Sequence, residues 1–206
     1  MKTVKGLVVA ALVMSIAGGA HASSIGAKFW YAEADGVEDP AMHYGVSGSL
    51  SLGGNLWLSG MYLIGTFEDV GGSTVDFDTA DGEAVLGYTA DIFDFGIGAR
   101  YSKWTIGTQA NGAEMQIFGP MVYAGVGNTF GDSPLGWYVG GSYMFLDLGD
   151  AYDVEGSETF EHYNVEGGLF LSIEALTATV GYRVKDYVNF DDAQFSGLAG
   201  TVGFGF

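Results

Sequence analysis

The sequence predicts an all-β protein: a closed antiparallel transmembrane β-barrel of about ten strands, with eight strands as the alternative. Three observations support this prediction. Apolar residues recur at every second position over long segments, short and long connections alternate along the chain, and acidic residues gather in the long connections. A period of two indicates strands, and a tilted strand of about ten residues is long enough to cross a bilayer.

The composition limits the class of protein. The 206 residues include 35 Gly, only 3 Pro and no Cys, and 15% are aromatic, which favours a β-rich chain with tight turns. Without Cys there is neither a disulfide nor a thiolate metal site. The formal net charge of −18 argues against a nucleic-acid partner, because phosphate binding requires Lys and Arg. The mean hydropathy of +0.23 fits that charge only if charged and apolar surfaces are segregated.

The first 22 residues have the pattern of a cleaved signal peptide. Lys2 and Lys5 precede an apolar segment, residues 6–16, and Ala20 and Ala22 form a small-residue cleavage site. The apolar segment is too short for a spanning helix, which needs about 20 residues. We therefore expect residues 23–206 to form the barrel domain.

Alternation is clearest in segment 41–52, where Met42, Tyr44 and Val46 share one face and His43, Ser47 and Ser49 share the other. No later stretch approaches 18 consecutive apolar residues, so no transmembrane helix is expected. The ten predicted strands are 24–33, 41–52, 56–67, 83–92, 95–105, 114–128, 137–147, 162–173, 176–186 and 194–206.

The connections indicate two ends with different roles. The short ones are 53–55, 93–94, 131–136 and 174–175, and the long ones are 34–40, 68–82, 106–113, 148–161 and 187–193. Of the 25 Asp and Glu residues, 17 lie in or beside the long connections. Outer-membrane barrels have short periplasmic turns and longer extracellular loops, so the acidic rim is expected outside the cell.

Two segments are ambiguous, and they leave the strand count open. Segment 56–67 has apolar residues on both faces, and Pro120 within segment 114–128 cannot donate a ladder hydrogen bond. We expect a bulge near Gly119 and Pro120, or a shorter strand.

The inward-facing positions predict a polar cluster in the lumen, made of Lys28, Arg100, Glu166 and Arg183. If 174–175 is a two-residue turn, Glu166 lies directly opposite Arg183, and we expect these two side chains to be in contact. The cluster is interpreted as structural, with a selectivity ring around a pore as the alternative. About eight strands leave an interior just filled by side chains, and ten leave little more.

Neither a catalytic nor a metal site is predicted. His43 and His162 fall at strand ends without a nucleophile or carboxylate at a useful spacing, so they are interpreted as polar rim residues. The acidic run 76–83 departs from the spacing of a calcium-binding loop by one residue. We expect no cofactor, although divalent cations could associate loosely with the acidic loops.

The signal peptide, the long amphipathic strands, segment 180–186 and the ending of residues 198–206 resemble small Gram-negative outer-membrane β-barrel proteins of the porin and OmpA-like type. The resemblance covers the whole of residues 23–206. In that family a C-terminal aromatic residue, preceded by apolar residues at every second position, is the signal for the barrel-assembly machinery. Here the matching residues are Leu198, Val202, Phe204 and Phe206, with Gly200 as the weak member.

The resemblance implies an outer-membrane location, with the lipid bilayer, lipopolysaccharide and the assembly machinery as partners. A lipid A deacylase of the family uses His-x-Ser followed by a Glu, a motif that neither His43 nor His162 shows, and omptin proteases have a longer chain, so an enzyme is not the leading hypothesis. The leading hypothesis is a non-enzymatic barrel with a structural or surface-interaction role. A narrow porin-like channel for small solutes is the alternative, followed by a lipid- or peptide-modifying enzyme and a secreted β-sandwich.

Overall fold

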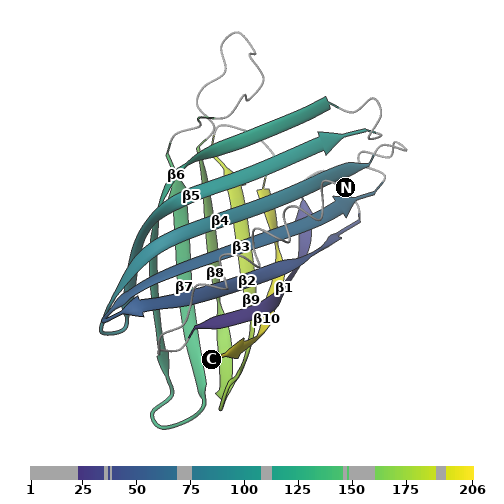
Figure 1. Ribbon diagram of the computed structural model, residues 1–206. Coiled ribbons are helices and arrows are strands. Elements are labelled where there is room, and N and C mark those ends of the chain that lie inside the picture. The colour runs from purple at the N-terminus through teal and green to yellow at the C-terminus, as the bar shows by residue number, and fades with distance from the viewer. Residues whose placement is uncertain are drawn as a thin grey trace.

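The protein is a closed antiparallel barrel of ten strands (Figure 1). The structure, a computed structural model, describes residues 23–34, 37, 39–68, 76–107, 113–145, 148, 161–188 and 194–206, so the predicted signal peptide lies outside the described residues. The strands are β1 (Ser24–Ala34), β2 (Ala41–Gly53), β3 (Leu56–Phe67), β4 (Phe77–Ala90), β5 (Phe93–Ile106), β6 (Ala113–Thr129), β7 (Leu135–Met144), β8 (His162–Ile173), β9 (Leu176–Tyr187) and β10 (Gln194–Gly205).

The predicted fold class and the count of ten strands are confirmed, and the eight-strand alternative is wrong. Each strand pairs with its neighbours in the sequence, and β1 pairs with β10 to close the sheet. Within the described ranges, no helix has the length and apolar character needed to cross a bilayer.

The seam between β1 and β10 is paired over its whole length, from Ser24 opposite Gly205 to Ala34 opposite Phe195. Beyond the last strand residue, the backbones of Ser23 and Phe206 exchange two hydrogen bonds, of 3.1 and 2.8 Å. Because Ser23 and Phe206 extend the pairing beyond the two strands, the sheet keeps no open edge at the seam.

One predicted turn is correct and one is displaced. Ile173 pairs with Leu176, so Glu174 and Ala175 form the two-residue turn, with Glu174 at φ 53°. The turn expected at 93–94 instead uses Asp91 and Ile92, because Ala90 pairs with Phe93. Asp91 adopts φ 58°, a left-handed conformation that Asp tolerates better than most residues.

Pro120 causes neither a bulge nor a short strand, so that expectation is wrong. The register between β5 and β6 is continuous, with Ala99 opposite Pro120. On the other side, pairing of β6 with β7 ends at Met121 opposite Met144. Pro120 therefore lies just beyond the β7 ladder, at an edge position where a missing N–H is tolerated.

The two faces of each strand have different surroundings. Large apolar residues on the outward face are exposed, including Tyr44, Leu86, Ile97 and Val180, as expected for a surface that meets lipid. Segment 56–67 is apolar on both faces because its inward residues, among them Leu63 and Phe67, are fully buried in the lumen. The interior is therefore filled with side chains.

Candidate functional site: the packed lumen

The lumen contains most of the positive charge of the described chain. Residues 23–206 contain five Lys and Arg, since Lys2 and Lys5 account for two of the seven in the full sequence. Four of the five are at most 8% exposed and lie on the inward face: Lys28, Arg100, Arg183 and Lys185. Burial of charges is costly unless each is paired and hydrogen-bonded, so their partners decide what the lumen can do.

Lys28 on β1 pairs across the lumen with Glu166 on β8. The Lys28 Nζ lies 2.9 and 2.7 Å from the two carboxylate oxygens of Glu166. The Tyr138 hydroxyl donates a further hydrogen bond of 2.9 Å to Glu166 Oε1. This group ties together three strands, β1, β7 and β8, that are not all sequence neighbours.

Glu83 on β4 neutralises two guanidinium groups. Arg100 forms an ion pair with Glu83 and also donates to Ser142 Oγ. The Nη2 atom of Arg183 lies 3.5 Å from Glu83 Oε1, and its guanidinium carbon lies 4.9 Å from the ring centroid of Trp30. One carboxylate thus links β4, β5 and β9 across the interior.

The register predicted for Glu166 and Arg183 is confirmed, because the two residues face each other on β8 and β9. Their expected mutual contact is replaced by other partners: among the described residues, Glu166 forms its ion pair with Lys28 and Arg183 forms its own with Glu83. The reason is geometric, since a side chain in a narrow barrel reaches strands on the far wall as easily as its neighbour.

Lys185 and Asp81 form a third buried group, which the sequence does not predict. Lys185 pairs with Asp81, and its Nζ donates to Ser102 Oγ at 2.7 Å. Ser102 Oγ also lies 2.9 Å from the Tyr187 hydroxyl. Asp81 and Glu83 were assigned to a long loop or its boundary, whereas β4 begins at Phe77 and directs both carboxylates inward.

An aromatic layer fills the lumen towards the long-loop end. Ring centroids lie 4.6 Å apart for Trp104 and Tyr187, 5.5 Å for Phe77 and Trp104, and 5.7 Å for Phe67 and Phe195. Trp30 continues the layer and is 1% exposed. The alternating pattern of the sequence could not place these rings inside, because aromatic residues are also typical of the lipid-facing surface.

Towards the short-turn end, inward aromatic rings cover glycines of adjacent strands. A Cβ atom on Gly87 would lie 2.1 Å from Trp57 Cζ2, and one on Gly136 would lie 2.2 Å from Phe170 Cζ. The rings therefore occupy space that only glycine leaves free. This packing accounts for part of the high glycine content.

The two histidines are buried and differ in their contacts. His43 Nε2 lies 2.6 Å from Thr79 Oγ1. The His162 ring lies against Tyr187, with ring centroids 4.8 Å apart and the ring planes tilted by 45°, and neither of its nitrogens has a hydrogen-bond partner among the described residues. Both histidines are in the lumen rather than at a solvated rim, so that part of the interpretation is wrong.

Several other buried polar atoms also lack a protein partner in the described part of the chain, including Arg100 Nη1 and Asn164 Oδ1. No group of three or more His, Cys, Asp or Glu side chains within the described ranges could hold a metal ion. The acidic run 76–83 is not a loop, since β4 places Asp78 outward and Asp81 inward.

The C-terminal residues form an outward apolar strip on β10. Leu198, Val202, Phe204 and Phe206 are all strongly exposed on the outward face. Gly200, the weak member of the pattern, is covered by Phe29 of β1, whose Cε2 atom lies 3.0 Å from the position of a Cβ at residue 200. The strip therefore continues across the seam.

The alignment with one solved structure agrees with this architecture. The translocator domain of the autotransporter NalP from Neisseria meningitidis aligns with a TM-score of 0.54 at 11% identity, covering 100% of this chain and 96% of that one. Ail of Yersinia pestis, solved with the heparin analogue sucrose octasulfate, gives 0.42 at 11% identity, covering 90% and 97%. The N-terminal barrel domain of Pseudomonas aeruginosa OprF gives 0.35 at 15% identity, covering 89% and 97%.

At such low identity the likeness to NalP shows the fold alone. No protein-family model matches the chain, and the search of curated proteins finds no match. The closed ten-strand antiparallel sheet, with its apolar outer face and packed polar interior, defines the class of this protein: it is a small β-barrel of the outer-membrane type.

Proposed function

We propose that this protein is a non-enzymatic barrel of the Gram-negative outer membrane, exported with residues 1–22 as a cleaved signal peptide, whose long-loop end is an acidic interaction surface outside the cell. The single observation that carries the proposal is the distribution of charge. Residues 23–206 contain 25 Asp and Glu against five Lys and Arg, and four of those five basic residues are buried in the lumen.

The ion pairs in the lumen support a structural role for the barrel interior. Its four basic side chains each form an ion pair with one of three carboxylates, those of Asp81, Glu83 and Glu166. The fifth basic residue, Lys103, lies on the outward face and pairs with Glu114. Little positive charge is therefore left to balance the acidic residues, and a cationic partner complements such a surface.

Binding of a fluorescent poly-lysine to outer-membrane vesicles tests this surface role. Replacing Asp39, Glu68 and Glu161 by their amides is expected to reduce binding severalfold, because the electrostatic attraction falls with the number of charges. The matched control replaces Asp91, Asp132 and Glu174, which lie at the short turns. Equal effects of the two triple variants would contradict the proposed orientation, and binding unchanged by the first would contradict the surface role.

A narrow channel for small solutes is the second candidate, and one observation favours it. Buried polar atoms of Arg100, His162 and Asn164 lack protein partners among the described residues, and water in the lumen would satisfy them. Conductance across a planar bilayer separates the two functions. A packed interior predicts no regular conductance steps, whereas steps that grow when Lys28 and Glu166 are replaced by alanine would support a channel.

A lipid- or peptide-modifying enzyme remains the least supported function. His43 is hydrogen-bonded to a threonine hydroxyl, and neither histidine forms a hydrogen bond or ion pair with a carboxylate in the described ranges. An unchanged lipopolysaccharide profile in cells that carry His43→Ala or His162→Ala is the expected result. A lost modification in either variant, with the barrel still assembled, would establish an enzyme.

The proposed partners are the bilayer, lipopolysaccharide and the barrel-assembly machinery. The assembly machinery would recognise the outward apolar strip on β10 that ends at Phe206. Divalent cations at the acidic loops remain a prediction, since much of those loops lies outside the described residues.

A further inference from the structure

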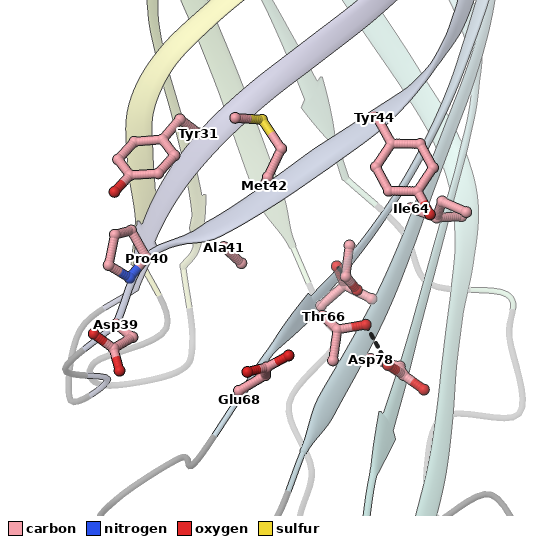
Figure 2. A pocket seen from close by; sticks show the side chains of 12 residues that line it. Tyr31, Asp39, Pro40, Ala41, Met42, Tyr44, Ile64, Thr66, Glu68 and Asp78 are labelled. Atoms are coloured by element: carbon pink, nitrogen blue, oxygen red, sulfur yellow. Dashed lines mark hydrogen bonds between the residues drawn. The ribbon is translucent and has the colours of Figure 1, made fainter.

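The outer face of the barrel has a groove of about 780 Å³ near the long-loop end, formed by β1 to β4 (Figure 2). Its volume is in the range of small-molecule sites, which span roughly 300–1,000 Å³. The groove opens on the outer face, and its lining also includes the buried residues Ala41 and Thr79.

The groove has an apolar side and an acidic side. Tyr31, Met42 and Tyr44 are outward-facing residues of β1 and β2, and they are 42, 54 and 60% exposed. Together with Ile64 of β3 they line the side away from the loops. Figure 2 shows Asp39 and Glu68 on the opposite, loop side of this apolar surface.

One carboxylate of the groove has a fixed orientation. Thr66 Oγ1 donates a hydrogen bond of 2.6 Å to Asp78 Oδ1, as Figure 2 shows. Because a carboxylate has about four acceptor sites, Asp78 retains acceptor capacity towards the groove. None of the described residues that line the groove is Lys, Arg or His, so its three acidic residues have no basic partner among them.

We infer that this groove binds a membrane lipid whose headgroup carries a primary amine, with the ammonium on the acidic side that contains Asp39, Glu68 and Asp78 and the hydrocarbon against Met42, Tyr44 and Ile64. Charge complementarity selects the headgroup, since an anionic lipid would meet three carboxylates without a counter-charge. The exposed apolar side selects a lipid over a free polycation, because it is continuous with the lipid-facing surface. The inference rests on the proposed membrane orientation.

The five methionines of residues 23–206 provide the probe. Met42 lines the groove, whereas Met61, Met121 and Met144 are inward-facing references. Methyl NMR of ¹³C-methionine-labelled barrel in a neutral detergent, titrated with dodecylamine, is expected to shift the Met42 signal saturably and leave the references unchanged. Dodecyl phosphate and spermine are expected to leave Met42 unshifted.

The double variant Glu68→Gln/Asp78→Asn is expected to weaken dodecylamine binding about tenfold, since hydrogen bonds to charged groups are the stronger ones. The matched control, Asp132→Asn/Glu174→Gln, removes two carboxylates at the other end of the barrel and is expected to bind like the wild type.

Besides the absence of a Met42 shift, three results would overturn the inference: an equal shift with spermine, a larger shift with dodecyl phosphate in the presence of Mg²⁺, or an unchanged affinity of the double variant. Failure of the proposed function looks different. A chain that does not assemble as a membrane barrel gives no dispersed methionine spectrum at all, whereas an assembled barrel without a Met42 shift contradicts the lipid site alone.

Discussion

Phe29 of β1 covers Gly200 of β10 on the outer face of the barrel. The two residues are directly paired across the seam, and Phe29 Cε2 lies 3.0 Å from the place that a Cβ on Gly200 would occupy. An aromatic ring over a glycine of the neighbouring strand restores the side-chain contact that glycine lacks. The strand that ends the chain therefore obtains part of its apolar surface from the strand that begins the barrel.

Phe29→Ala should lower the free energy of unfolding by about 1 kcal/mol, the upper range for a cross-strand pair. Urea titration of the barrel in lipid vesicles measures this change. The control is Phe95→Ala, because Phe95 is also an outward phenylalanine but faces Tyr88 and Ala124 instead of glycine. An equal loss in the two variants would contradict a specific role for the ring over Gly200.

Removing one partner of the ion pair between Lys28 and Glu166 should destabilise the barrel. Lys28→Met leaves a buried carboxylate without its cation and should reduce the free energy of unfolding by about 3 kcal/mol. Adding Glu166→Gln should recover most of that loss, because the amide oxygen still accepts the Tyr138 hydrogen bond.

The outward pair of Lys103 and Glu114 is the control for this cycle. Its side chains are 33 and 44% exposed, against 10 and 14% for Lys28 and Glu166. Lys103→Met should therefore change the free energy of unfolding by less than about 1 kcal/mol. Similar losses for the two lysines would mean that the lumen is wet enough to screen its charges.

The contacts of Glu166 show which features of the lumen could be predicted from the sequence. A two-residue turn fixes the register of its hairpin, so the facing of Glu166 and Arg183 follows from the turn at 174–175. Lys28, the actual partner of Glu166, is 138 residues away and on a strand that is not adjacent to β8. The alternating pattern predicts whether a residue faces inward or outward. It does not predict which strand on the opposite wall an inward side chain contacts.

Asp81 shows a second limit. Acidic residues, glycine and alanine near position 80 have low strand propensity, and they predict a loop there. The ladders to β3 and β5 and the ion pair with Lys185 make this segment a strand. Tertiary partners therefore overrode local propensity, which a single sequence does not reveal.

The two histidines should respond differently to replacement by leucine. His43→Leu removes the 2.6 Å contact with Thr79 and should lower the free energy of unfolding by about 1 kcal/mol. His162→Leu replaces a ring whose nitrogens have no partner among the described residues, so stability should be unchanged or higher. Equilibrium unfolding in vesicles compares the two, and a clear loss for His162→Leu would point to water bound at its ring.

Gly87→Ala should destabilise the barrel by about 2 kcal/mol, because the new methyl group would lie 2.1 Å from Trp57. Near-ultraviolet circular dichroism should also change, since the indole must move. In a Trp57→Leu background the same substitution should cost less, and the coupling between the two changes measures the contact. Additive effects would place the strain elsewhere.

Phe206→Ser should impair assembly in the membrane more than it changes any surface property. The residue is exposed on the outward face while its backbone is hydrogen-bonded to Ser23, so the side chain is available for recognition and for lipid. Membrane levels measured by heat-modifiable migration on gels report assembly. Phe130→Ser, at an exposed position in a short turn, is the control, and normal levels of the Phe206 variant would show that the ending is incidental.

The pairing of β1 with β10 also has a consequence for assembly, because the barrel cannot close before β10 is available. Every other pair of adjacent strands is consecutive in the sequence, whereas the seam joins residues 24–34 to residues 195–205. Until those last residues arrive, two rows of backbone N–H and C=O groups lack partners, and a hydrocarbon interior does not satisfy them. Any route into a bilayer must therefore shelter both edges until β10 has paired with β1.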